Sequence, residues 1–224
     1  KMSLDISQYQ KAYDVLNNLQ LTHNFEHLYT KLNLNDPKVP EDVYKSHLED
    51  VSFFKPSADP DEQNLSAAFV NGYLNLGYGR DKLILQDDDF AYKTKEAGKI
   101  SAVASIGAIF QWKEEGLQKL DKYLYSEDTD LQAGALVGLG LLSAGVRPEE
   151  ADETFELLAD FVNGFENDKV RAALLGLTIA FSGSRNEKVQ KCFMDKLTQE
   201  DVSFDIACMS ALGLGHAFVG SGNP

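Results

Sequence analysis

Two histidines in the N-terminal part of the sequence have the spacing of a metal-binding pair. His23, Glu26 and His27 match the H-x-x-E-H pattern of inverted zinc proteases, in which two histidines one helical turn apart bind zinc and the glutamate acts as the base. Glu96 lies far enough downstream to be considered as a third ligand. However, the pattern is short, and a loop and small-residue repeats follow it in place of a protease scaffold. We therefore interpret the histidines as partly exposed residues of a helix and expect no metal and no cofactor.

Paired glycines elsewhere in the sequence could suggest a nucleotide-binding loop. Gly138 and Gly140, and again Gly213 and Gly215, each enclose one leucine. A dinucleotide-binding fingerprint needs a preceding strand and an acidic residue about 20 residues further on, whereas these glycines lie within predicted helices and recur along the chain. The sequence also lacks a G-x-x-x-x-G-K-[ST] loop and a G-x-S-x-G elbow. No group of residues would support catalysis, and we predict that the chain is not an enzyme.

The glycines belong to a small-residue pattern that occurs five times between residues 64 and 224. Each copy is an apolar stretch rich in Ala, Gly and Ser, and alignment on one glycine per copy gives steps of 35, 31, 38 and 37 residues. A period of this size indicates stacked helical pairs. The aligned glycine would allow close helix packing, and a second glycine seven residues later, present in four copies, would end the helix in the left-handed conformation. The aligned glycines are Gly72, Gly107, Gly138, Gly176 and Gly213, and the later ones are Gly79, Gly145, Gly183 and Gly220.

Amphipathic, charged segments alternate with these copies, at 116–125, 148–165 and 186–197. We expect an all-α solenoid with the small-residue helices on its concave side and the charged helices on its convex side.

The predicted domains are an N-terminal helical segment at 1–50, a linker at 51–63, and about five repeats over 64–224 that are truncated at the C-terminus. Within the first of these, residues 4–34 have apolar positions at helical spacing. A further loop is predicted at 86–99. Neither end of the chain has the polar capping repeat that a solenoid needs, so we expect a piece of a longer protein.

The sequence has a net charge of −14 and a pI of about 4.6. Nucleic acids and anionic membranes need a basic surface, so we expect neither as a partner, whereas a basic or polar protein partner is compatible. The composition, 43% hydrophobic and 25% charged, is that of a soluble folded protein. The two cysteines, Cys192 and Cys208, are too few for a disulfide framework, and we expect buried thiols in a reducing compartment.

The segment at 148–166 differs from the other charged segments. From Pro148 through Asp168 the sequence has no Lys or Arg, whereas eight residues are acidic. The helix dipole stabilises acids near the N-terminus, but Glu156 and Asp160 extend a ladder of like charges that should be destabilising. Such a surface suits a partner whose apolar patch is ringed by Lys and Arg; an ordinary solvated face is the alternative. The apolar positions predicted to be buried are Ala151, Phe155, Leu158, Val162 and Phe165.

The alternation of small-residue and charged helices resembles the proteasome/cyclosome repeats of the two largest non-ATPase subunits of the proteasome regulatory particle. The stretches PKVPEDVYKSHLED (37–50), NLSAAFVNGYLNLGYGRDKL (64–83) and GLQKLDKYLYSEDTDLQAGALVGLGLLSAGV (116–146) are similar to the subunit of this family that sits on the ATPase ring and serves as a receptor of ubiquitin and ubiquitin-like domains. The resemblance covers nearly all of 37–224.

This resemblance implies a non-catalytic scaffold and receptor in the cytoplasm and nucleus. It implies that the outer helices bind ubiquitin and the ubiquitin-like domains of shuttle factors and of a deubiquitinase, and that the subunit contacts proteasomal ATPases. The alternative is a purely structural solenoid segment that contacts the ATPases without binding ubiquitin. The residues that we expect to contact a ubiquitin-like domain are Asp121, Tyr125, Glu149, Asp152, Glu153, Glu156 and Asp160.

Overall fold

All regular secondary structure that the computed structural model describes is helical, in agreement with the predicted all-α fold. The chain divides into two compact units, residues 1–37 and 38–224, and each is treated by itself below. The predicted linker at 51–63 lies mostly outside the described residues, and its last four residues form the first turn of a helix. The described residues are 6–17, 19–34, 36–40, 42, 60–86, 90–146, 152–164 and 167–222.

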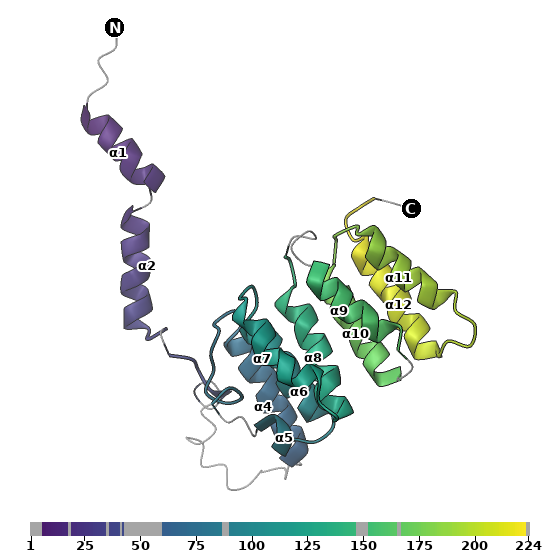
Figure 1. Ribbon diagram of the computed structural model, residues 1–224. Coiled ribbons are helices and arrows are strands. Elements are labelled where there is room, and N and C mark those ends of the chain that lie inside the picture. The colour runs from purple at the N-terminus through teal and green to yellow at the C-terminus, as the bar shows by residue number, and fades with distance from the viewer. Residues whose placement is uncertain are drawn as a thin grey trace, which may run out of the picture. The chain divides into compact units, whose positions relative to one another are not determined.

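The first unit contains two helices, α1 (Ile6–Asn17) and α2 (Leu19–Lys31) (Figure 1). Together they cover most of the predicted helical stretch at 4–34. Apolar residues recur at helical spacing on α1, but within the described structure Tyr9 and Leu16 are 58% and 84% exposed. The helical pattern is therefore confirmed, and within the described residues of this unit the apolar face of α1 stays exposed.

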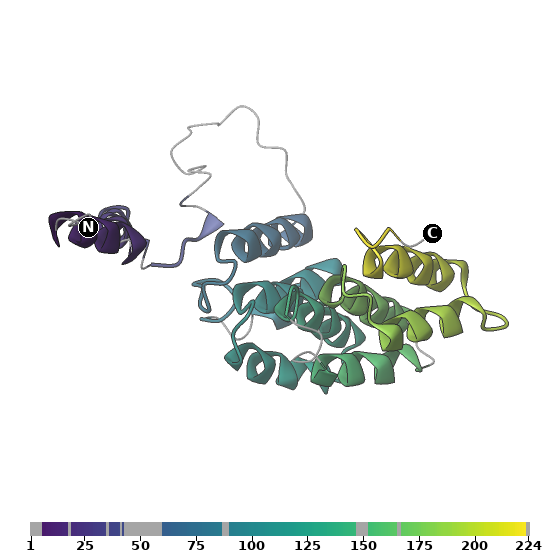
Figure 2. The ribbon, with the colours of Figure 1, turned by 90° about the horizontal axis from the view of Figure 1, so that it is seen from above.

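The second unit is a stack of helices in two layers (Figures 1 and 2). Each inner helix packs mainly on the inner helices before and after it, and each outer helix packs mainly on the inner helix that follows it in the chain. This is the predicted solenoid of helical pairs. The inner layer consists of α4 (Pro60–Leu74), α6 (Ala97–Ile109), α8 (Thr129–Leu142), α10 (Asn167–Ala180) and α12 (Phe204–Ala217). The outer layer consists of α7 (Glu115–Leu124), α9 (Asp152–Val162) and α11 (Glu187–Leu197).

The core lies between neighbouring helices of the stack, as expected for a solenoid in which each repeat contacts its neighbours. The inner helices supply most of it, because their small residues leave room for leucines on both sides. The outer helices add one buried stripe each, for example Leu158 on α9 and Phe193 on α11. The inner-helix residues that are fully buried include Ala102, Val103, Ala135, Leu136, Leu139, Ala173, Leu174 and Leu177.

The aligned glycines bring helix backbones together, as predicted. A Cβ atom added to Gly107 on α6 would lie 1.9 Å from the carbonyl oxygen of Gly138 on α8. One added to Gly176 on α10 would lie 2.6 Å from the carbonyl oxygen of Leu136. Any side chain at these positions would push adjacent inner helices apart.

The second glycine of each pair also has the predicted role. Gly79, Gly145, Gly183 and Gly220 have φ values of 79°, 77°, 70° and 70°, in the left-handed region that glycine adopts at low cost. Two of these turns are tied to the next repeat. The N–H of Gly79 donates to the carbonyl of Ile109, and the N–H of Gly183 donates to the carbonyl of His216, both at 2.8 Å. The turn after one inner helix thus satisfies carbonyls at the end of the next.

The prediction of a continuous loop at 86–99 is wrong. A short helix, α5 (Phe90–Lys93), occupies its middle, and α6 begins at Ala97. Ala91 is 1% exposed, and the hydroxyl of Thr94 donates to its carbonyl at 3.0 Å. Burial of this alanine in the stack stabilises a helical turn that is too short to show periodicity in the sequence.

Candidate protein-binding surface on the outer helices

Helix α9 presents a buried apolar face and an exposed acidic face. Phe155, Leu158 and Val162 are 8%, 0% and 0% exposed, which confirms the predicted buried face at these positions. Ala151 and Phe165, which were also expected on it, lie outside the described residues. The carboxylates of the opposite face remain exposed, and no Lys or Arg lies on this helix.

The predicted contact residues fall on two successive outer helices. Glu153, Glu156 and Asp160 lie together on the exposed side of α9. Asp121 is exposed on α7, and Tyr125, directly after α7, is 75% exposed. Of the two other candidates, Glu149 lies outside the described residues, and for Asp152, which begins α9, only the backbone is described.

The apolar residues of α7 mostly belong to the core. Leu120, Tyr123 and Leu124 are 0%, 1% and 3% exposed, so a partner cannot reach them. Tyr123 packs beside Tyr92, with ring centroids 6.0 Å apart, and Lys122 Nζ lies 4.7 Å from its centroid. Tyr125 is therefore the large apolar side chain at this end of α7 that is free to contact a partner.

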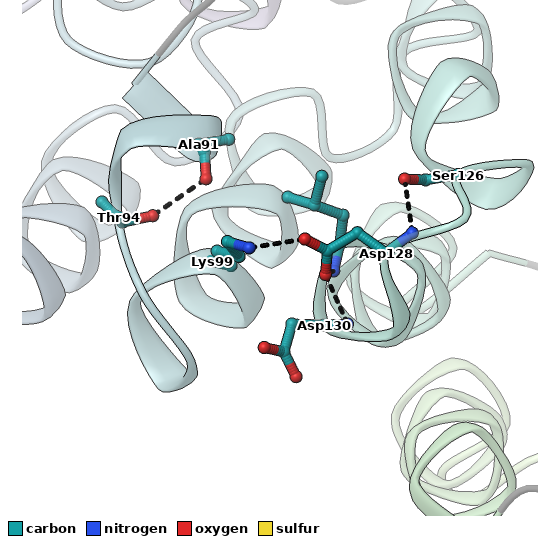
Figure 3. Close-up of polar contacts among 7 residues, drawn as sticks. Ala91, Thr94, Lys99, Ser126, Asp128 and Asp130 are labelled. Carbon is teal, nitrogen blue, oxygen red and sulfur yellow. Dashed lines mark hydrogen bonds and ion pairs between the residues drawn. The ribbon is translucent and has the colours of Figure 1, made fainter.

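An ion pair holds the turn that follows Tyr125 (Figure 3). Asp128 caps the N-terminus of α8, where its carboxylate accepts from the N–H groups of Asp130 and Leu131, and Lys99 Nζ on α6 lies 2.5 Å from its Oδ2. The backbone N–H of Asp128 also donates to the hydroxyl of Ser126 at 3.1 Å. These contacts fix the connection between α7 and α8.

The same ion pair shifts both pKa values. The hydrogen bond from Lys99 lowers the pKa of Asp128, and burial opposes this shift. The hydrogen bond to Asp128 raises the pKa of Lys99, again against burial. Both groups are therefore charged across the neutral range. A comparable tie recurs further along, where Arg171 on α10 lies 3.3 Å from Asp205 in the first turn of α12.

The position of α11 lysines beside α9 was not predicted from the sequence. Lys188 Nζ is 5.8 Å from the centroid of the Phe155 ring, although the two residues are 33 positions apart in the sequence. A groove of about 350 Å³ separates the two helices. The acidic face of α9 is thus local, as expected, and it borders a surface of opposite charge.

The inner face of the stack also has a groove, of about 470 Å³. It is almost entirely apolar and is lined by α4, α6, α8 and α10, with Phe69 and Tyr73 of α4 52% and 76% exposed. Periodicity predicted that small-residue helices line the concave side, but it did not predict the large exposed aromatic residues of α4 in this groove.

Comparison with known proteins identifies the family. A sequence profile of the RPN1 N-terminal domain matches residues 1–49. The chain is 34% identical, over its whole length, to the 26S proteasome non-ATPase regulatory subunit 2 of Dictyostelium discoideum, of which it covers 25%. It is 41% identical, over 96% of its length, to the 26S proteasome regulatory subunit rpn1 of Schizosaccharomyces pombe, of which it covers 25%. Over 62% of its length it is 48% identical to RPN1 of Candida glabrata, of which it covers 14%. The chain is thus similar, over nearly its whole length, to RPN1-type regulatory subunits of the 26S proteasome.

The chain spans about a quarter of the length of these two relatives, which it matches over 96% or more of its own length. Both matches include the small-residue inner helices and the charged outer helices of 38–224. The expected family is thereby confirmed.

The candidate metal and thiol residues of the chain have ordinary surroundings. His23 and His27 are exposed on α2, and no group of three possible metal ligands occurs in the described ranges. Both cysteines are free thiols. The expectation that both are buried is wrong for Cys208, which is exposed on α12, whereas Cys192 is partly buried on α11. No helix within the described part of the chain is long and apolar enough to span a membrane.

Proposed function

We propose that this chain is part of a non-catalytic regulatory subunit of the 26S proteasome, in the cytoplasm and nucleus, and that its outer helices bind ubiquitin and the ubiquitin-like domains of shuttle factors and a deubiquitinase. The names of the relatives support the regulatory role. The observation that carries the binding role is the exposed acidic face of α9, with Glu153, Glu156 and Asp160 on a helix without a Lys or Arg.

The mechanism is weak, reversible docking. The acids of α9 attract a partner whose apolar patch is ringed by basic residues, which speeds association and orients the complex more than it adds affinity. Tyr125 supplies an exposed aromatic contact on the neighbouring outer helix. Retention of a substrate then comes from several linked ubiquitin modules that bind at once, since linked modules raise the effective concentration of each other.

A titration measures this directly. Ubiquitin-like domain is added to the ¹⁵N-labelled 224-residue chain, and amide shifts are expected on α9 and after α7. Glu156→Lys with Asp160→Lys should weaken binding about five- to thirtyfold, because two exposed ion pairs and the repulsion that replaces them together amount to ~1–2 kcal/mol.

Glu62→Lys with Glu200→Lys is the matched control. It makes the same change in net charge at exposed positions outside α7 and α9, and it should leave binding nearly unchanged. Equal binding by the α9 variant and the wild type would show that the acidic face is not the docking surface.

The second candidate function is that of a structural segment that contacts proteasomal ATPases without binding ubiquitin. The apolar inner groove, with its exposed Phe69 and Tyr73, favours it. It predicts no amide shifts on adding ubiquitin-like domain. It also predicts that Phe69→Glu with Tyr73→Glu in the full-length subunit prevents incorporation into the regulatory particle while leaving the isolated subunit folded.

A further inference from the structure

The groove between α9 and α11, which we call the α9–α11 groove, has one uncharged wall. This wall consists of Phe155 and Ala159 of α9 and of Asn163 directly after it, at intervals of four residues that together span about 12 Å. The exposed acids Glu156 and Asp160 are not among the residues that line it. The acidic face of α9 and the α9–α11 groove are therefore separate surfaces of the same helix.

The opposite wall, on α11, is cationic. Lys188, Lys191 and Lys196 line it together with one acid, Asp195, in a chain whose net charge is −14. Lys188 lies over the Phe155 ring. Lys196 Nζ donates to the side-chain oxygen of Gln199 at 3.1 Å. In the described part of the chain Lys191 is exposed and has no ion pair or hydrogen bond, so its ammonium group is available to a ligand.

The floor of the α9–α11 groove is uncharged. Phe155 is 8% exposed, and Ala159 and Cys192 are partly buried. Burial raises the pKa of the Cys192 thiol to about 11, so the thiol is neutral at physiological pH. A ligand that fills the groove would therefore meet an apolar floor, formed by Phe155, Ala159 and Cys192, beside the lysines of α11.

We propose that the α9–α11 groove binds a short acidic segment of a partner protein, with one apolar side chain on the floor and carboxylates at Lys191 and Lys196. About four extended residues span the 12 Å of the α9 wall. The apolar floor favours a peptide over a nucleic acid or a free phosphate, which would leave it unfilled. This partner has the opposite charge to the ubiquitin-like domain proposed for the acidic face of α9, so the two proposals are independent.

The test uses fluorescence anisotropy of the 224-residue chain with a short labelled peptide in which one leucine lies between two pairs of aspartates. Lys191→Glu with Lys196→Glu is expected to weaken binding at least about tenfold. Lys82→Glu with Lys119→Glu, which makes the same change in net charge at exposed positions outside the groove, should have less than about a twofold effect. Replacing the leucine of the peptide with glycine should also weaken binding, because the floor is then empty.

Location is tested by thiol protection. The bound peptide should slow the modification of Cys192 by a small thiol reagent without slowing that of Cys208, which is exposed on α12. The proposal is overturned if the peptide does not bind at ~1 mM, if both lysine variants weaken it equally, or if an oligothymidine or a lysine-containing version of the peptide binds as well. Ubiquitin-like domain should bind the Lys191→Glu, Lys196→Glu variant as tightly as it binds the wild type. The two proposals can therefore be tested, and can fail, separately.

Discussion

Substitution of Gly107 by alanine tests whether backbone contact between inner helices stabilises the stack. The added Cβ would lie 1.9 Å from the carbonyl oxygen of Gly138, whereas ordinary van der Waals contact begins at 3.4 Å. Helices α6 and α8 would have to separate locally by about 1.5 Å, because the obstacle is backbone and cannot rotate away.

The expected cost follows from two opposing terms. Overpacking in a core costs about 1–3 kcal/mol, and a backbone obstacle lies at the upper end of that range. Replacing an interior helical glycine with alanine recovers up to about 1 kcal/mol of helix propensity. The free energy of unfolding should therefore fall by roughly 2 kcal/mol, which lowers Tm by about 4–8 °C in a chain of this size.

Gly215→Ala is the matched control, because it makes the same chemical change on inner helix α12. A Cβ atom there would have nothing within 4 Å, so only the propensity term remains and the variant should be more stable than wild type by about 0.5–1 kcal/mol. Thermal and urea unfolding followed by circular dichroism measures both. If Gly107→Ala is as stable as wild type, or if both variants shift in the same direction, close backbone packing is not the reason for the glycine.

Three further predictions concern single side chains. Lys99→Met should cost about 1 kcal/mol at pH 7. Since the folded pKa of Asp128 is lowered and that of Lys99 is raised, this difference should persist through the neutral range and disappear as the pH falls below about 4 or rises past about 10.5 in unfolding curves. Cys208 should react with a thiol reagent at pH 8 well before Cys192, whose pKa burial raises to about 11; mass spectrometry of tryptic peptides would show the order, and equal rates would contradict it. Asn186 accepts from two N–H groups at the start of α11, so Asn186→Ala should lower the free energy of unfolding by ~1 kcal/mol in urea, and an unchanged midpoint would show that the cap is not needed.

The predicted site residues could be placed in part from the sequence. The spacing of Phe155, Leu158 and Val162 was enough to bury one face of α9 and leave Glu156 and Asp160 exposed, because helical periodicity is a local property. Residue spacing could not show that Tyr125 is exposed and Tyr123 is buried. Both are aromatic residues near the end of α7, and only the packing of Tyr123 beside Tyr92 and of α7 on α8 decides which of them is buried.

The family resemblance, the all-α class and the repeat of helical pairs could be predicted from the sequence, since they depend on residues within about one repeat of each other. The packing role of Gly107 and its equivalents could also be predicted, because their period excludes a phosphate loop. The contacts between side chains of different repeats follow only from the tertiary structure. Lys99 pairs with Asp128, and the lysines of α11 lie beside Phe155 of α9. Side chains some 30 residues apart meet only after the helices have stacked, and stacking depends on the shape of the whole buried surface. For that reason the acidic helix was visible in the sequence, and the cationic groove beside it was not.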